Sequence, residues 1–183
     1  METIRLFLAS SITDLHEERM EIGNFIRILN DRMFDRGTDL YFRLDMCEYI
    51  SDTVADRRKQ DVYNSGIRDS DLCVLLLRHR VGEYTLEELR TARNACKENG
   101  KPELMIFVEE PEEGRNAEPS VGEALASLDA EGIPYTRFRH IDSALWQIQR
   151  RLAETVGLNA EILGEGMYPD GARLYGIDPE KQN

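Results

Sequence analysis

The chain has 183 residues, enough for one well-packed domain, and its 41% hydrophobic and 32% charged content is typical of a soluble globular protein. Its formal net charge of −12 argues against non-specific binding to nucleic acids or anionic membranes. Because no apolar run approaches the roughly 20 residues that span a bilayer, we expect no membrane segment and no nucleic-acid partner.

Cysteines and histidines are too few and too scattered to indicate a metal site. Cys47, Cys73 and Cys96 form no CxxC pair, and the three histidines lie far apart. This odd, sparse cysteine count predicts a reducing, cytoplasmic location. The acidic Glu2, followed by no long apolar core, predicts a first strand rather than a signal peptide.

The first predicted elements are a strand and an amphipathic helix. Residues 4–9, IRLFLA, predict the strand, with Ser10 and Ser11 in the turn after it. Asp14 and Glu17 have the spacing of a capping box, which predicts the helix start. Five apolar residues then recur at helical spacing and predict one buried face: Ile22, Phe25, Ile26, Leu29 and Met33.

Residues 40–46 predict a second strand, which is less apolar than the first and therefore nearer a sheet edge. Residues 47–58 are polar and lack clear periodicity, so we expect a loop that leads into a helix over 56–68. Residues 71–77 form a continuous apolar run, which is typical of a strand covered on both faces. The helix that follows is predicted to end at Asn99 and Gly100.

The remainder alternates in the same way. The predicted elements are a strand at 103–108, an exposed acidic loop at 109–120, a short helix at 121–129, a strand at 135–140 and a helix at 142–156. Residues 157–183 have many turn signals and little periodicity, so we expect a tail or a connector there.

Five strands alternating with helices predict an α/β domain over residues 1–156, with three layers and a mainly parallel sheet. The simplest strand order is flavodoxin-like, 2-1-3-4-5. In that order the first and third strands end at the switch point where such sheets bind ligands. We therefore expect Ser10 and Ser11 to converge with residues 80–84 on one crevice.

Glu88 is the carboxylate that this arrangement singles out. At about 100° per residue it projects roughly at a right angle to the buried direction of its helix, whereas Glu87 points nearly opposite, into solvent. We predict that Glu88 faces the crevice and is partly desolvated. Burial raises a carboxyl pKa, and the helix dipole with Arg78 or Arg80 lowers it, so the sequence leaves the sign open. The alternative is a surface acid favoured in a first helical turn.

Other residues near the crevice also allow two interpretations. Ser10 and Ser11 are either ligand contacts or simple turn residues. Tyr84 either stacks on a base or covers the sheet edge. The first loop has no glycine, so it forms neither a GxGxxG nor a P-loop phosphate cradle, which argues against an ATPase or an ordinary dehydrogenase.

Two segments carry a resemblance to a known family. LFLASSITDLHEER supplies Ser10, Ser11, Asp14, Glu18 and Arg19, and YNSGIRDSDLCVLLLRHRVGEYTLEELRTA supplies Ile67, Ser70, Asp71, Arg80, Gly82, Tyr84, Thr85 and Glu88. Over about residues 4–156 the chain resembles the TIR-like domains of an uncharacterised bacterial family. Such domains often precede NACHT-type ATPase or repeat regions.

The resemblance implies an activity and its residues. The wider superfamily contains TIR domains that cleave NAD and the nucleoside 2-deoxyribosyltransferases, and in both a glutamate at the matching place of Glu88 carries the chemistry. Thr85 stands where cysteine is common in TIR domains, and Tyr84 is the nearest counterpart of a common tryptophan. The implied substrate-binding residues are Ser10, Ser11, Asp14, Arg80 and Tyr84, with NAD as substrate and no cofactor.

Three functions follow from this reasoning. The first is an N-glycosidase for NAD or a related nucleotide, serving bacterial defence or signalling and activated when copies assemble. The second is a non-catalytic module that self-associates or docks an adjoining sensor domain. The third is an enzyme like the deoxyribosyltransferases, which exchanges bases between nucleosides.

Overall fold

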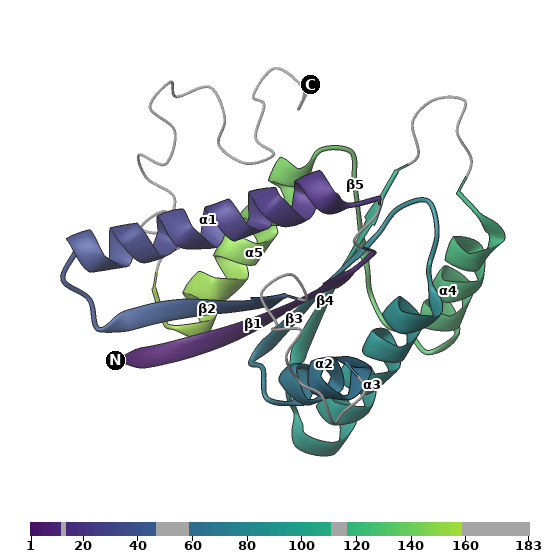
Figure 1. Ribbon diagram of the computed structural model, residues 1–183, viewed down its shortest axis with the longest axis horizontal. Coiled ribbons are helices and arrows are strands. Elements are labelled where there is room, and N and C mark those ends of the chain that lie inside the picture. Colours follow the sequence, from purple (N-terminus) through teal and green to yellow (C-terminus); the bar gives the residue numbers. More distant parts are fainter. Residues whose placement is uncertain (12–13, 47–58, 111–116, 159–183) are drawn as a thin grey trace.

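Strands and helices alternate along the chain, which the computed structural model describes for residues 1–11, 14–46, 59–110 and 117–158 (Figure 1). The elements are β1 Glu2–Ser10, α1 His16–Asp35, β2 Leu40–Met46, α2 Lys59–Arg68, β3 Leu72–Leu77, α3 Glu83–Asn99, β4 Glu103–Glu109, α4 Pro119–Ala130, β5 Thr136–Phe138 and α5 Ile141–Thr155. The predicted alternation is confirmed, although β5 is shorter than residues 135–140. The predicted loop at 47–58 and most of the predicted tail lie outside the described residues, and the domain boundary at 156 stays a prediction.

The five strands form one sheet in the order β2-β1-β3-β4-β5, and every pairing is parallel. This confirms the predicted flavodoxin-like order and places β2 at an edge. All six residues of β3 are buried, as expected for a central parallel strand covered on both faces. Gly100 takes a left-handed conformation, with φ +72°, and ends α3 where the sequence predicted.

Helices cover both faces of the sheet (Figure 1). α1 and α5 pack on one face, and α2, α3 and α4 pack on the other. Because side chains alternate along a strand, Leu6 and Leu8 of β1 face the first helical layer, whereas Phe7 and Ala9 face the second. The three layers bury two apolar cores, and the same alternation directs Ser10 toward α1.

The start of α1 differs from the prediction. The helix begins at His16 with Leu15 at its N-cap, and no side chain caps it, so the predicted capping box of Asp14 and Glu17 is wrong. Leu15 is completely buried. Its packing in the core therefore sets the position of the first turn, which local capping patterns do not reveal.

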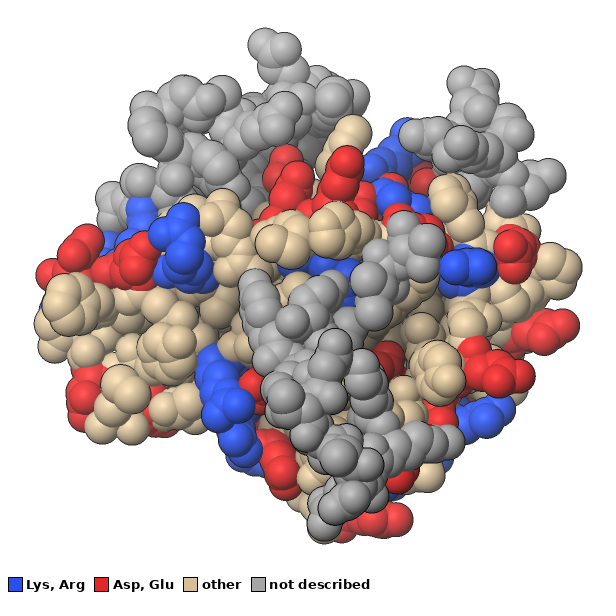
Figure 2. Space-filling view, in the orientation of Figure 1, with Lys and Arg blue, Asp and Glu red and all other residues tan. Residues whose placement is uncertain are grey.

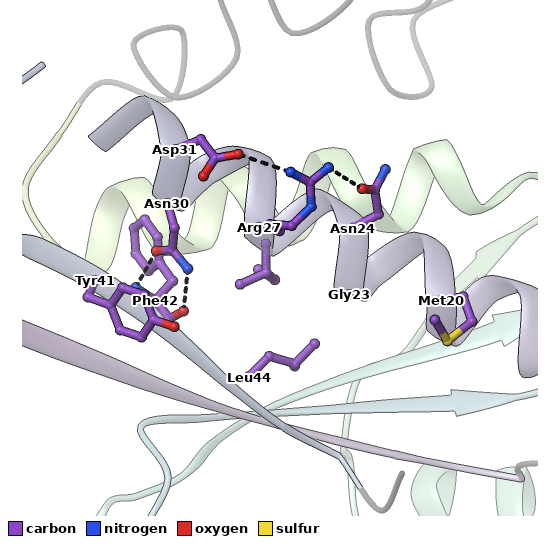
Figure 3. Close-up of a pocket in the computed structure, with 10 residues that line it drawn as sticks. Met20, Gly23, Asn24, Arg27, Asn30, Asp31, Tyr41, Phe42 and Leu44 are labelled. Carbon is purple, nitrogen blue, oxygen red and sulfur yellow. Dashed lines mark hydrogen bonds and ion pairs between the residues drawn. The ribbon is translucent and has the colours of Figure 1, made fainter. Parts of the chain in front are cut away.

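At Phe42, the free edge of β2 is covered by a side chain of α1. Asn30 Nδ2 donates to the Phe42 carbonyl oxygen at 2.8 Å, and the Phe42 N–H donates to Asn30 Oδ1 at 2.7 Å (Figure 3). Asn30 thus satisfies the two main-chain groups that a neighbouring strand would otherwise bind. Such a cover protects an edge strand from pairing with another chain.

We expect Asn30→Leu to lower the free energy of unfolding by about 1–3 kcal/mol, because the Phe42 N–H and C=O lose their partners. Urea unfolding at a fixed protein concentration measures this change. Asn24→Leu is the matched control, since Asn24 is exposed on the same helix and accepts a hydrogen bond from the exposed Arg27. Equal effects of the two substitutions would contradict the role given to Asn30.

The surface is mixed in charge. On the face shown in Figure 2, Asp and Glu side chains lie among Lys and Arg side chains. Ion pairs at the surface of the molecule include Lys101 with Asp71 at 2.6 Å and Arg27 with Asp31 at 3.1 Å. Within the described part of the chain, no helix is both long enough and apolar enough to cross a membrane.

Candidate active site

The candidate site lies at the carboxyl ends of β1 and β3. These strands are neighbours, with Ser10 at the end of β1 paired to Leu76 of β3. After β1 the chain continues to α1 on one face, and after β3 it continues to α3 on the other (Figure 1). The two connections diverge, which makes this the topological switch point at which open parallel sheets bind ligands.

Glu88 reaches this place from α3, and its side chain is only 8% exposed. Leu89 and Ala92 of the same helix pack into the core against the sheet. Glu88 is therefore more deeply desolvated than the predicted boundary position. The prediction that Glu87 points into solvent is wrong, because Glu87 is half-buried and accepts a hydrogen bond from Asn64 of α2 at 2.7 Å. α2 packs against this side of α3.

Arg19 links the end of β1 to the buried acid. Its side chain is completely buried, and Nη1 donates to Ser10 Oγ at 2.6 Å and to the Ser10 carbonyl oxygen at 3.4 Å. Its positive charge also acts on Glu88. Through this contact with Ser10, α1 brings a cation across the strand end to the switch point.

Arg78, directly after β3, has a structural role beside this site. It pairs with Glu18 of α1 and with Glu109 of β4, and its Nη1 donates to the Asp14 carbonyl oxygen at 2.6 Å. These contacts tie the start of α1 to two strand ends. The cation that lowers the pKa of Glu88 is therefore Arg19, and not Arg78 or Arg80 as the sequence suggested.

The pKa of Glu88 is raised to about 7, chiefly by burial. The charge of Arg19 and a hydrogen bond from Gln60 oppose this rise, and the charge of Glu87 adds to it. Near neutral pH the carboxyl group thus exists both ionised and protonated, which suits a group that reacts or transfers a proton. Burial and the charge of Glu88 also raise the pKa of the Cys73 thiol, so Cys73 stays protonated and unreactive.

α2 supplies buried amide side chains that the sequence analysis missed. Gln60 is 4% exposed and Asn64 is 7% exposed, and Gln60 Nε2 donates to Asn64 Oδ1 at 3.3 Å. Gly66 lets this helix approach the sheet closely, since a Cβ there would lie 3.2 Å from the Phe7 ring. The available signal was spacing, because positions 60 and 64 lie in line with the buried Ile67 at i, i+4 and i+7.

The other predicted binding residues differ in their exposure to solvent. Ser11 is half-buried, and both carboxylate oxygens of Asp14 are buried with no hydrogen-bond partner. Arg80 is exposed, and Tyr84 is 68% exposed. Of the predicted residues, the structure therefore brings Ser10 and Glu88 together through Arg19 and leaves Arg80 and Tyr84 at the surface.

A separate groove of about 550 Å³ lies between α1 and β2 (Figure 3). Its charged residues, Arg27 and Asp31, are exposed and pair with each other. It therefore lacks the desolvated ionisable group that marks the switch point. Among the described residues, no group of His, Cys, Asp and Glu side chains is arranged to hold a metal ion.

Comparison with known proteins gives one family match. A family model described as "Domain of unknown function (DUF4062)" matches residues 5–131. No curated protein matches the sequence. Among solved structures, the Clostridium botulinum CMP N-glycosidase BcmB has 17% sequence identity and a TM-score of 0.47, and the match covers 80% of this chain and 98% of that chain. The TIR domain heterodimer of RPS4 and RRS1 has 14% identity and a TM-score of 0.45, with 84% and 98% covered.

Proposed function

The chain belongs to the DUF4062 family, and we propose that it is an N-glycosidase for NAD or a related nucleotide, with Glu88 as the reacting carboxylate. The burial of Glu88 at the switch point between β1 and β3 carries this proposal. An ionisable group with a perturbed pKa at such a place is a candidate for catalysis on physical grounds. The resemblance of the two sequence segments to TIR-like domains supports the same choice of residue.

The chemistry explains why a buried carboxylate is suited to this reaction. When an N-glycosidic bond breaks, the base leaves with the bonding electrons and positive charge builds on the ribose. An ionised Glu88 stabilises this charge or captures the anomeric carbon, and water then releases the sugar. A carboxylate that is shielded from water, as Glu88 is, acts on the developing charge more strongly than one in water.

The surrounding residues have proposed binding roles. Ser10, Ser11 and the amino-terminal end of α1 hold a phosphate or ribose hydroxyl groups. The two buried oxygens of Asp14 accept hydrogen bonds from ribose hydroxyls. Tyr84 stacks on a base, and Arg80 contacts a phosphate from its exposed position. In this proposal the enzyme needs no cofactor, and the nucleotide is its substrate.

A second candidate is a non-catalytic module that self-associates or docks an adjoining sensor domain. One observation favours it: the completely buried Arg19 contacts Ser10 and acts on Glu88, and so occupies part of the space between them. A buried pair of this kind also occurs in structural ion networks. In this case the oligomeric state is insensitive to Glu88→Gln and sensitive to substitutions on exposed helix faces.

The deciding experiment incubates the full chain, dilute and concentrated, with NAD and separately with nucleoside monophosphates. We expect release of the free base, detected by chromatography, and a higher specific activity in the concentrated sample if assembly activates the enzyme. A second free base is added in a parallel sample, because base exchange identifies the transferase alternative. If no base is released at either concentration, the glycosidase proposal is wrong and the module remains.

A further inference from the structure

Asn64 is the centre of a buried hydrogen-bond network between α2 and α3. Its Nδ2 donates to Glu87 Oε1 at 2.7 Å. Its Oδ1 accepts from Gln60 Nε2 and from Thr91 Oγ1, each at 3.3 Å. The orientation of the amide follows from these partners, because a carboxylate accepts hydrogen bonds and so requires the Asn64 nitrogen on its side.

The same network reaches Glu88. Gln60 lies one helical turn before Asn64, and its side chain is hydrogen-bonded to Glu88 as well as to Asn64. Two amides from α2 therefore hold two adjacent carboxylates of α3, Asn64 holding Glu87 and Gln60 holding Glu88. Because Gln60, Asn64 and Glu88 are each at most 8% exposed, water does not readily replace a lost partner.

We propose that Asn64 is a positioning residue, which fixes Gln60 and Glu87 and thereby sets the direction and the protonation of the Glu88 carboxylate at the switch point. It acts through its neighbours and does not touch the reacting atoms. The kinetic part of this inference rests on the proposed glycosidase function, whereas the structural part concerns the protein without substrate.

Asn64 affects the pKa of Glu88 through some of the groups that face this carboxyl. Arg19 approaches from α1, Glu87 is its neighbour in α3, Cys73 lies in β3, and Gln60 approaches from α2. Of these, Asn64 contacts Gln60 and Glu87. The bond from Gln60 favours the ionised carboxylate, so its loss raises the pKa of Glu88.

The test titrates the Glu88 side-chain carboxyl by ¹³C NMR in the natural chain and in Asn64→Leu, which has nearly the same volume and no hydrogen-bonding groups. We expect the midpoint to rise by about half a pH unit or more, which is roughly a threefold change in the ionisation equilibrium. Thr91→Val is the matched control. It removes one hydrogen bond to Asn64 but leaves the bonds to Gln60 and Glu87, so it lowers stability without moving the midpoint.

Activity gives the second readout. We expect the pH profile of base release in Asn64→Leu to shift in the same direction, with a lower kcat and little change in KM. Asn64→Ala also removes the hydrogen bonds to Gln60 and Glu87 and adds no charge, so it serves if the leucine variant does not fold. A midpoint that is unchanged in the folded Asn64 variants, with a loss of stability like that of Thr91→Val, means that Asn64 is only structural. A shifted midpoint in a chain that releases no base means that the positioning is right and the proposed function is wrong.

Discussion

We expect Glu88→Gln to lower kcat for base release by about 100- to 1,000-fold, the effect of removing one preorganised electrostatic group from an active site. Glutamine has nearly the same shape as glutamate but cannot become negatively charged. It therefore leaves the oxocarbenium-like sugar without its carboxylate, while contacts to the rest of the nucleotide persist. Steady-state kinetics with the nucleotide that the natural chain cleaves fastest is the measurement, and KM is expected to change little.

Glu87→Gln is the control for this experiment. Glu87 lies next to Glu88 and is half-buried, and a glutamine oxygen still accepts the hydrogen bond from Asn64. The negative charge of Glu87 raises the pKa of Glu88. Glu87→Gln is therefore expected to retain activity, with the acidic limb of its pH profile displaced toward lower pH. If both substitutions reduce kcat equally, Glu88 is not the reacting group.

Glu88→Gln is also expected to stabilise the folded protein at neutral and alkaline pH. Below the ordinary carboxyl pKa of 4.5, Glu88 is protonated both folded and unfolded and contributes no pH dependence. Between that value and about 7 the unfolded chain loses the proton while the folded chain keeps it, so stability falls as pH rises. Above pH 7 the whole destabilisation is present, and a shift of this size corresponds to about 3 kcal/mol.

Chemical denaturation at pH 4 and at pH 8.5 tests this expectation. Glu88→Gln and the natural chain are expected to have similar stability at pH 4, and the variant is expected to be the more stable one at pH 8.5. Glu98→Gln changes an exposed acid of the same helix and is expected to give a curve parallel to that of the natural chain. If the stability of Glu88→Gln changes with pH in the same way as that of the natural chain, burial of the Glu88 carboxyl does not oppose its ionisation.

Much of the fold was predictable because the strands and helices follow from local, periodic patterns of apolar residues. The apolar run at residues 71–77 identifies a central strand, and the stripe from Ile22 to Met33 identifies the buried face of α1. Alternation of strands and helices then leaves few chain paths that keep crossovers right-handed. The place of Glu88 near the end of β1 followed from that topology.

The partners within the site were not predictable in the same way. The contact of Arg19 with Ser10 joins a helix to a strand end, whereas sequence patterns of a helix describe only neighbours at i+3 and i+4. The burial of Glu88 and of Glu87 depends on α2. The amide side chains of this helix cover the side of α3 that a helical wheel predicts to be exposed to solvent. These are tertiary effects, and the pattern of a single helix does not contain them.

Main-chain pairing is limited at both edges of the sheet, because β5 has only three residues and Asn30 already binds the N–H and C=O groups of Phe42 in β2. A complex of several copies, whether a catalyst or a scaffold, would therefore join side chains on helical surfaces and not extend the sheet as a fibril does. Ion pairs between exposed side chains in such a contact are expected to weaken as the salt concentration rises.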